Sequence, residues 1–273
     1  ALDRGIAQPQ PRELRHVFHF IGRQRFSHAR SIRSTKRRKR ETSKPWIINQ
    51  LVRGHPTLHS AMHIDAESLS IAERYKLLIG CVVPRPIALV STVSPEGRVN
   101  LAPFSFFNGV GSNPMTVVFC PANRPEPDAF GSWEKDSLRN AKPVSEGGTG
   151  QFVVNASVEA YERKIAGAAE PLAFGESEFD LVGLTTVASE RVQPPRVKES
   201  PWAFECETIQ VVRTNANAPA AGNLVIGRVV HIHIDDALVN ERMHVDPDQL
   251  RAIGRMGGFG YTRTTDRRSE EHT

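Results

Sequence analysis

At residues 85–108 the chain reads RPIALVSTVSPEGRVNLAPFSFFN, and this stretch joins strand signals, a tight turn and a group of small polar residues. Residues 87–93 are mostly apolar and partly β-branched, which favours a strand. Ser94-Pro95-Glu96-Gly97 has the Pro-then-Gly order of a β-turn, and extended sequence resumes over residues 99–102. The stretch therefore predicts a β-hairpin, around which we expect the rest of the chain to be organised.

Pro103 sets the expected end of this hairpin. Proline has no N–H to give to a sheet ladder, so we expect strand pairing to stop there. The next residues, Phe104-Ser105-Phe106-Phe107-Asn108, would then leave the sheet and present hydroxyl, aromatic and amide groups together. A flat, partly polar ligand would suit such a loop.

The basic charge of the chain is concentrated at its start. Residues 1–61 hold 14 Lys or Arg against three acids, whereas the remainder holds 21 against 27. We therefore expect residues 1–61 to be a basic, disordered N-terminal extension, residues 62–265 to form the folded domain and residues 266–273 to be a polar tail. Because acids outnumber bases in the folded part, it does not predict a nucleic-acid surface.

Three interpretations of residues 1–61 stay open. The segment is Arg-rich and acid-poor, as organelle transit segments are, with residues 16–30 as an amphipathic helix. The basic block KRRKR at residues 36–40 would instead suit nuclear localisation or nucleic-acid binding. The third interpretation is a stretch outside the working protein. We favour it because the first methionine is Met62 and the periodic, core-forming sequence begins just after it.

The three cysteines, Cys81, Cys120 and Cys206, lie far apart within apolar runs. Their odd number and spacing predict neither a disulfide framework nor a metal site. A reducing compartment fits best, so we expect a cytoplasmic protein, with organelle targeting by residues 1–61 as the alternative. No apolar stretch approaches the roughly 18 residues of a membrane-spanning helix, so we expect no membrane association.

Beyond the hairpin, hydrophobic patterning predicts mainly strands with a few short helices. One helix is expected over residues 68–79, with Ala72, Tyr75, Leu78 and Ile79 near one face, and another is capped by Ser157 and runs to about residue 169. Apolar or alternating runs predict strands over residues 115–120, 152–155, 202–213 and 224–234. Residues 176–201, which include Pro194-Pro195, are expected to form a mixed loop.

A second polar cluster follows the first strands. A Pro-rich loop carries Arg124 and leads to Lys135-Asp136-Ser137, where Asp136 or Ser137 would cap a short helix. The free N–H groups of a helix start, with Lys and Arg nearby, would form a seat for an anion. An ordinary solvated cap is the alternative interpretation.

Three further patterns predict no catalytic role. Gly147-Gly148-Thr149-Gly150 lacks the Lys-Ser/Thr ending of a phosphate loop and precedes a strand. His231 and His233 are two apart on a strand, but no spacing indicates the third ligand that a metal would need. The glycine-rich residues 254–261 do not follow a strand of the dinucleotide-binding kind.

Several short pieces occur in a recognisable order along residues 75–261. They are RPIALVST at 85–92, GRVNLAPFSFFN at 97–108, KDS at 135–137 with Asn140, FVVN at 152–155, FDLVGL at 179–184, PPR at 194–196, IGRVV at 226–230 and the Gly-Arg, Gly-Gly and Tyr residues at 254–261. In these pieces the chain resembles the flavin reductase-like family of FMN-binding split-barrel proteins, which includes the flavoredoxin-type proteins.

The resemblance implies a mainly β fold, an antiparallel Greek-key split β-barrel with a few short helices, that forms a homodimer with FMN near the subunit interface. Carried over by position, it implies flavin contacts for Ser91, Thr92, Asn100, Ala102, Pro103, Phe104 and Ser105. It implies a phosphate and ribityl site at Arg124, Lys135, Asp136 and Ser137, which favours the anion seat over the solvated cap. Backbone amides beside an interrupted strand would hydrogen-bond the polar edge of the flavin ring.

The resemblance further implies a flavin reductase-like oxidoreductase, in which FMN accepts hydride from NADH or NADPH. Hydride transfer to a flavin needs no acid–base pair, so we predict no catalytic side chain. The alternative is a non-catalytic FMN-binding protein that carries electrons or stores FMN. Nucleic acid is expected as a partner only through the basic residues 1–61.

Overall fold

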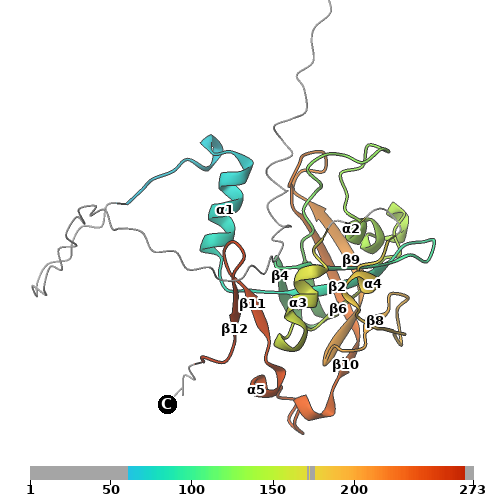
Figure 1. Ribbon diagram of the computed structural model, residues 1–273. Coiled ribbons are helices and arrows are strands. Elements are labelled where there is room, and N and C mark those ends of the chain that lie inside the picture. The colour runs from blue at the N-terminus through green and yellow to red at the C-terminus, as the bar shows by residue number, and fades with distance from the viewer. Residues whose placement is uncertain (1–60, 171, 173–175, 268–273) are drawn as a thin grey trace, which may run out of the picture. The chain divides into compact units, whose positions relative to one another are not determined.

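The computed structural model describes residues 61–170, 172 and 176–267 (Figure 1). By its contacts the chain divides into two units, Ala1–Leu69 and Ser70–Thr273. The described part of the first unit holds one 3₁₀ turn, Ala66–Ser68, and all other elements belong to the second. The predictions made for residues 1–60 and 268–273 lie outside the described residues.

The second unit is built mainly of strands. They are β1 (Arg85–Pro86), β2 (Ala88–Val93), β3 (Val99–Phe104), β4 (Phe107–Ser112), β5 (Met115–Phe119), β6 (Gln151–Asn155), β7 (Thr186–Val187), β8 (Arg196–Val197), β9 (Trp202–Arg213), β10 (Asn223–Ile234), β11 (Ile253–Arg255) and β12 (Tyr261–Arg263). The α-helices are α1 (Ile71–Cys81), α2 (Asp136–Ala141), α3 (Glu162–Gly167), α4 (Glu178–Val182) and α5 (Pro247–Leu250). Short 3₁₀ turns are η3 (Ala66–Ser68), η4 (Val144–Glu146), η5 (Glu159–Tyr161) and η6 (Asp236–Leu238).

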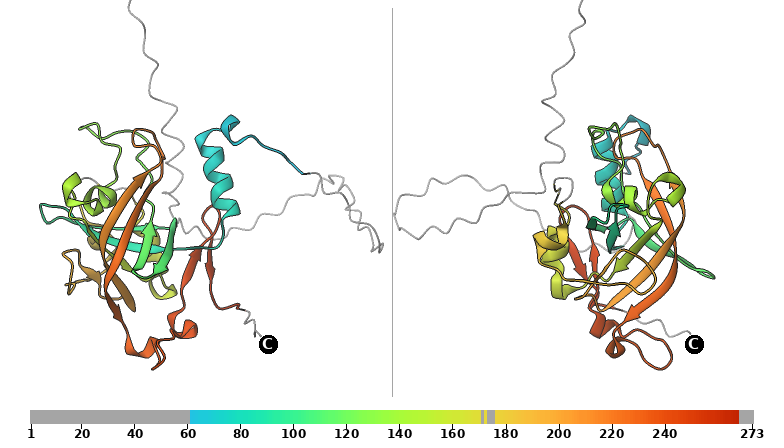
Figure 2. Two further views of the ribbon diagram at one scale, coloured as in Figure 1. Left: turned by 180° about the vertical axis from the view of Figure 1, so that it is seen from behind. Right: turned by 90° about the vertical axis from the view of Figure 1, so that its right-hand side faces the viewer.

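A seven-stranded antiparallel sheet forms the body of this unit, in the order β3-β2-β6-β9-β10-β5-β4. Its two edge strands, β3 and β4, follow each other in the chain and are separated only by Ser105 and Phe106. Edges joined by so short a link must meet at that end, so the sheet curls into a barrel (Figures 1 and 2). No ladder between described residues joins β3 to β4, and the barrel is therefore split. The predicted antiparallel split barrel is confirmed.

Strand β2 is buried on both faces, which explains why its sequence is almost continuously apolar. Ala88 and Val90 belong to a cluster with Phe119 and Phe152, which fills the barrel. Leu89 lies on the opposite face, in a cluster that also takes in residues of α3 and α4. Inside the barrel, the ring centroid of Phe119 lies 5.1 Å from that of Phe104 and 4.9 Å from that of Phe152. This aromatic row is the centre of the core.

The β2–β3 hairpin forms as predicted, but the prediction that pairing stops at Pro103 is wrong. Pro103 pairs with Leu89 inside the ladder, and β3 continues to Phe104. The backbone N–H of Leu101, two residues earlier, points away from β2 and donates to the Glu178 carboxylate at 2.9 Å. Position 103 faces the same strand-free side, where a missing N–H costs no ladder bond.

Residues 107 and 108 also stay in a sheet, contrary to the prediction. Phe107 and Asn108 begin β4 and pair with β5, so only Ser105 and Phe106 lie between strands. The link is held in place because Cys120 donates its backbone N–H to the Phe106 carbonyl at 2.8 Å. The expected binding loop is thus reduced to a two-residue connection between two strand ends.

Helix α1 begins at a capping box made by Ser70 and Glu73 and runs to Cys81. Of its predicted apolar face only Ile79 is buried, whereas Tyr75 is 56% and Leu78 50% exposed. The helix ends against the β11–β12 hairpin instead of lying across the seven-stranded sheet (Figure 2). The apolar face of α1 is therefore largely exposed, and only Ile79 at its end is buried.

Three local predictions fail for identifiable reasons. Ser157 does not cap a helix, because an η5 turn intervenes and α3 begins only at Glu162, after Tyr161. Helix α4 lies within the predicted loop, where its five residues are too few to show a helical period. Two register shifts in β10, one beside Gly227 and one beside Val229, break the side-chain alternation expected there.

Some features are absent from the part of the chain that the structure describes. No described helix is both long and apolar enough to cross a bilayer. No group of three or more His, Cys, Asp or Glu residues within it could hold a metal ion. Cys81, Cys120 and Cys206 are all free thiols.

The first prediction concerns Gly227, which lies directly against the buried Phe152 ring. A Cβ at this position would fall well inside van der Waals contact with two ring carbons. We expect Gly227→Ala to lower the free energy of unfolding in urea by about 1–3 kcal/mol, because the ring has no free space to move into. Gly109→Ala on β4 is the control, since nothing lies within 4 Å of its added Cβ. Equal stability of the two variants would contradict this packing.

The second prediction concerns Glu178, whose carboxylate caps the free edge of β3. Desolvation, and more weakly the charge of Asp136, raise the pKa of Glu178 above 4.5. The folded state then holds its proton to higher pH than the unfolded state, so this group's contribution to stability falls as pH rises from 4.5 through the folded-state pKa.

Glu178→Gln removes this titration, while its amide oxygen still accepts from Leu101. Unfolding in urea at a series of pH values should show the variant gaining stability relative to the wild type as pH rises above 4.5. The exposed Glu241→Gln is the control. A stability difference between wild type and Glu178→Gln that does not change with pH would refute the prediction.

Candidate functional site

The predicted residues Thr92 and Asn100 lie opposite each other at the end of the β2–β3 hairpin. Both are held by helix α2: the Asn140 side-chain amide donates to the Thr92 hydroxyl at 3.1 Å, and the Asn100 amide donates to the Ser137 hydroxyl at 3.0 Å. Thr92, Ser137 and Asn140 are buried and Asn100 is half-buried. The structure therefore joins the hairpin to the Lys135-Asp136-Ser137 segment, which the sequence left 35 or more residues apart.

The start of α2 differs from the prediction. Lys135, and neither Asp136 nor Ser137, occupies the N-cap position, and no side chain there caps the helix. Ser137 uses its hydroxyl on Asn100, and Asp136 uses its carboxylate on Arg124. The predicted helix cap is wrong because both side chains have partners outside the helix.

Arg124 is already engaged. Its guanidinium donates to Asp136 Oδ1 at 3.0 Å and, through Nε, to the Glu134 carbonyl at 3.0 Å. Asp136 also lies 3.7 Å from Arg139. Two of the predicted anion-site residues thus neutralise each other.

Lys135 is the available cation of this cluster. It is exposed as a whole residue, and no ion pair to it is found among the described residues. Desolvation by neighbouring protein, and then the positive charge of Arg124, lower the pKa of its ammonium. An anion bound to this ammonium would raise the pKa of Lys135 again, because it supplies the missing opposite charge.

Ser91 is not brought together with the other predicted residues. Neighbouring strand residues point to opposite faces, so Ser91 faces away from Thr92. It is fully buried, its hydroxyl donates to the Pro195 carbonyl at 2.5 Å, and it accepts from Asn155 at 3.3 Å. The Ser91 side chain therefore stabilises the protein interior and does not face the candidate site.

The segment from Ala102 to Ser105 lies half-buried at the rim of the barrel. The Phe104 ring packs inward on Phe119. The Ser105 hydroxyl points instead to Arg85, whose Nε donates to it at 3.2 Å. Ala102, Pro103 and Ser105 thus present backbone and small side chains at the open edge of β3.

Sequence reasoning missed three residues of this region: Arg85, Asn140 and Glu178. Asn140 lay among the pieces that carry the family resemblance, and its place one turn after Ser137 could have indicated a shared face. Arg85 and Glu178 act on residues 20 and 77 positions away, through contacts that only the fold creates.

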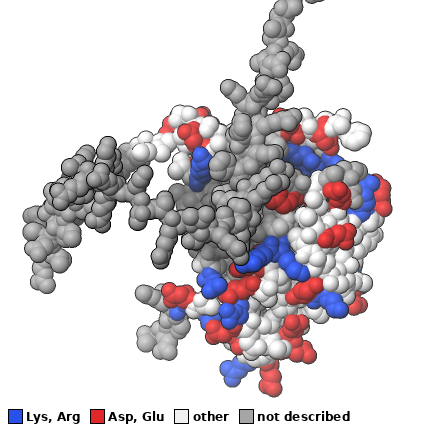
Figure 3. Space-filling view, in the orientation of Figure 1, with Lys and Arg blue, Asp and Glu red and all other residues white. Residues whose placement is uncertain are grey.

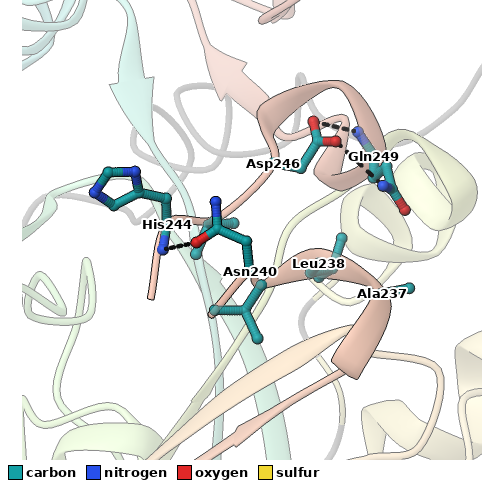
Figure 4. A pocket seen from close by; sticks show the side chains of 8 residues that line it. Ala237, Leu238, Asn240, His244, Asp246 and Gln249 are labelled. Carbon is teal, nitrogen blue, oxygen red and sulfur yellow. Dashed lines mark hydrogen bonds between the residues drawn. The ribbon is translucent and has the colours of Figure 1, made fainter. Parts of the chain in front are cut away.

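A surface depression of about 320 Å³ lies elsewhere, between η6 and α5 (Figure 4). It contains none of the predicted residues. Two of its polar side chains are used locally: Asn240 accepts from the His244 backbone N–H at 3.1 Å, and the Asp246 carboxylate accepts from the Gln249 side chain at 3.1 Å. The depression is therefore separate from the hairpin and α2.

The face drawn in Figure 3 shows basic and acidic side chains interspersed over the described surface. No broad single-sign area that would attract a nucleic-acid backbone stands out on this face. Within the described part of the Arg124, Lys135 and Asp136 cluster, the Lys135 ammonium has no ion pair, whereas Arg124 pairs with Asp136.

Residues 79–253 match the family model of the flavin reductase like domain. The uncharacterized protein YwrF of Bacillus subtilis is 38% identical over 201 residues, which cover 73% of this chain and 93% of YwrF. The matched region contains the hairpin, α2 and the residues that the structure links between them.

Solved structures agree with this assignment. Nitrilotriacetate monooxygenase component B from Bacillus cereus is 32% identical, with a TM-score of 0.69 and coverage of 77% of this chain and 99% of that chain. The 2-nitrobenzoate 2-nitroreductase NbaA from Pseudomonas fluorescens is 30% identical, with a TM-score of 0.66 and coverage of 78% and 96%. The chain belongs to the flavin reductase-like family.

Proposed function

We propose that this protein binds FMN at the rim of the barrel and acts as an NAD(P)H-dependent flavin reductase-like oxidoreductase. The observation that carries the proposal is the hydrogen-bond network of Thr92, Asn100, Ser137 and Asn140. It fixes the open edge of β3, a candidate surface for the ring, relative to Lys135, a candidate anchor for the phosphate.

The residues present fit the chemical parts of FMN. The phosphate needs a cation without a partner, and Lys135 provides one. The ring needs an apolar surface with a few polar groups, which the half-buried segment from Ala102 to Ser105 provides. In this proposal Arg124 acts mainly by holding the Asp136 carboxylate in place. Ser91 does not contact FMN and instead stabilises the protein interior through its hydrogen bond to Pro195.

Bound FMN would supply the chemistry, accepting hydride from a nicotinamide and passing electrons onward. The chain's own residues bind and orient: the α2 network fixes the hairpin, the barrel core excludes water from one side, and Lys135 holds the charged end. Two of the similar solved structures, a nitroreductase and a monooxygenase component, are named for redox reactions, which supports an electron-transfer role.

We further propose a homodimer, supported by the exposed face of α1. Ile71, Tyr75, Leu78 and Val82 are each at least half exposed and recur at helical spacing. Phe259, at the tip of the β11–β12 hairpin beside the end of α1, is 63% exposed. A second copy would cover this apolar face.

The three free thiols support the further proposal of a reducing, cytoplasmic location.

The test of the proposed activity has two steps. Titration with FMN, followed by flavin absorbance and fluorescence, measures binding. Steady-state oxidation of NADH and of NADPH with FMN present then separates a reductase from a carrier or store. Turnover with one nicotinamide is expected. FMN binding without turnover would favour the non-catalytic alternative. If FMN does not bind, both the reductase and the non-catalytic FMN-binding protein are refuted.

Lys135→Ala gives a specific prediction for the phosphate anchor. We expect the Kd for FMN to rise by about tenfold, because one charge-assisted contact is lost. The loss should shrink as salt is added, since salt weakens the attraction between the ammonium and the phosphate.

Riboflavin, which lacks the phosphate, serves as the matched ligand control and should bind wild type and Lys135→Ala equally. Lys198→Ala removes an exposed lysine between β8 and β9 and should leave the Kd for FMN unchanged. An unchanged FMN Kd in Lys135→Ala would remove Lys135 from the site.

The dimer gives another prediction. Leu78→Glu places a charge in the exposed face of α1, so a dimer built on this face should dissociate to monomers in sedimentation velocity. Val144→Glu, at a residue that is 73% exposed in η4, is the control and should remain dimeric. A wild type that sediments as a monomer would refute the dimer itself.

A further inference from the structure

Arg85 is almost completely buried, with 4% of its surface exposed. Its guanidinium donates four hydrogen bonds: to the carbonyls of Ile79 at 2.7 Å, Val82 at 2.6 Å and Met256 at 3.0 Å, and to the Ser105 hydroxyl at 3.2 Å. Three of these acceptors are backbone carbonyls. The fourth is the hydroxyl of a residue at the proposed flavin site.

The charge of Arg85 has no carboxylate partner within the described residues. The residue opposite it in the β1–β11 ladder is Arg255, another cation. Arg255 bonds the Gly258 carbonyl at 2.8 Å and stacks on the Tyr261 ring at 4.5 Å, so it brings no negative charge either. Carbonyls at the end of α1 offset part of the Arg85 charge. A buried cation that is only partly compensated is costly for the fold.

Ser105 gains a defined role from this contact. A serine hydroxyl has one hydrogen to donate and lone pairs that accept. Arg85 occupies a lone pair, and no acceptor for the hydroxyl hydrogen is found among the described residues. The hydrogen is thus left for an outside acceptor, and the adjacent cation makes the hydroxyl a stronger donor. The Phe106 ring, 5.9 Å from the guanidinium carbon, helps to fix the same link.

We propose that Arg85 is a positioning residue that orients and polarises the Ser105 hydroxyl toward a ligand whose acceptor gains negative charge, namely the flavin ring on reduction. The inference rests on the proposed function. Oxidised flavin has a neutral ring, whereas the reduced ring carries negative charge when it has taken up two electrons and one proton. A donor backed by a buried cation therefore binds the reduced ring more tightly than the oxidised ring.

A purely structural role for Arg85 makes a different prediction. In that case the three hydrogen bonds from Arg85 to backbone carbonyls would only hold the end of α1 against the β11–β12 hairpin. Their loss would lower the stability of the fold and would change the affinities for oxidised and reduced FMN by the same factor. Only a role through Ser105 changes the ratio of the two affinities. That ratio sets the difference between the midpoint potentials of bound and free FMN.

The experiment compares wild type, Arg85→Lys, Ser105→Ala and the double variant as full-length protein. Lysine keeps the positive charge and can still reach carbonyls, but it lacks the Nε–H that contacts Ser105, so this variant is chosen to keep the fold. Dissociation constants for oxidised FMN and the midpoint potential of bound FMN are measured for each. Arg228→Met removes an arginine that is 53% exposed on β10 and is the control.

We expect Arg85→Lys and Ser105→Ala each to weaken binding of reduced FMN relative to oxidised FMN by about tenfold. For a two-electron couple, tenfold corresponds to a midpoint potential lower by about 30 mV. The double variant should show no more than the larger single effect, because both changes remove the same contact. Arg228→Met should not change the potential.

Other outcomes overturn the inference. If both single variants bind FMN with the wild-type midpoint potential, Arg85 has only a structural role, while the proposed FMN site stands. If the two effects add in full, Arg85 does not act through Ser105. If the wild type does not bind FMN at all, the proposed function fails and the inference fails with it.

Discussion

The fold depends on a constraint of connectivity: the two edge strands of a seven-stranded sheet are joined through only Ser105 and Phe106. A sheet whose edges are tied this closely must curl, and it curls around Phe104, Phe119 and Phe152. These side chains and their neighbours fill the core of the barrel. The predicted site residues other than Ser91 lie instead at the rim and on the adjoining α2 segment.

At this rim most charged groups satisfy one another. Arg124 pairs with Asp136, and Arg139 pairs with Asp128. Asn100 and Asn140 bind hydroxyls and so fix the hairpin against α2. Among the groups that keep no polar acceptor or ion pair within the described residues are the Lys135 ammonium and the Ser105 hydroxyl hydrogen. A site of this kind selects a ligand by the few groups that remain unpaired, since the rest of its polarity is internal.

Local signals in the sequence predicted the fold well where one element decides the outcome. The hairpin follows from its turn residues, and β9 follows from a long alternating run. The failures arise where a distant contact decides. Pro103 stays paired because Glu178 and not another strand lies at that edge, and the helix cap is missing because Ser137 bonds Asn100. Within the site, Thr92, Asn100 and Ser137 were predicted and lie close together. Ser91 was also predicted, but its side chain points into the protein interior. Arg85 was missed because its hydrogen-bond partners come from three separate parts of the chain.

The open edge of β3 has a consequence for the behaviour of the protein in concentrated solution. A strand edge with free N–H groups can recruit an edge from another molecule and start a growing sheet. Here one such N–H is covered by the Glu178 carboxylate, and the next outward position is a proline that has none to offer. Glu178 and Pro103, the two residues that made the sequence-based expectation fail, therefore leave this edge of β3 with fewer free N–H groups to recruit a strand from another molecule.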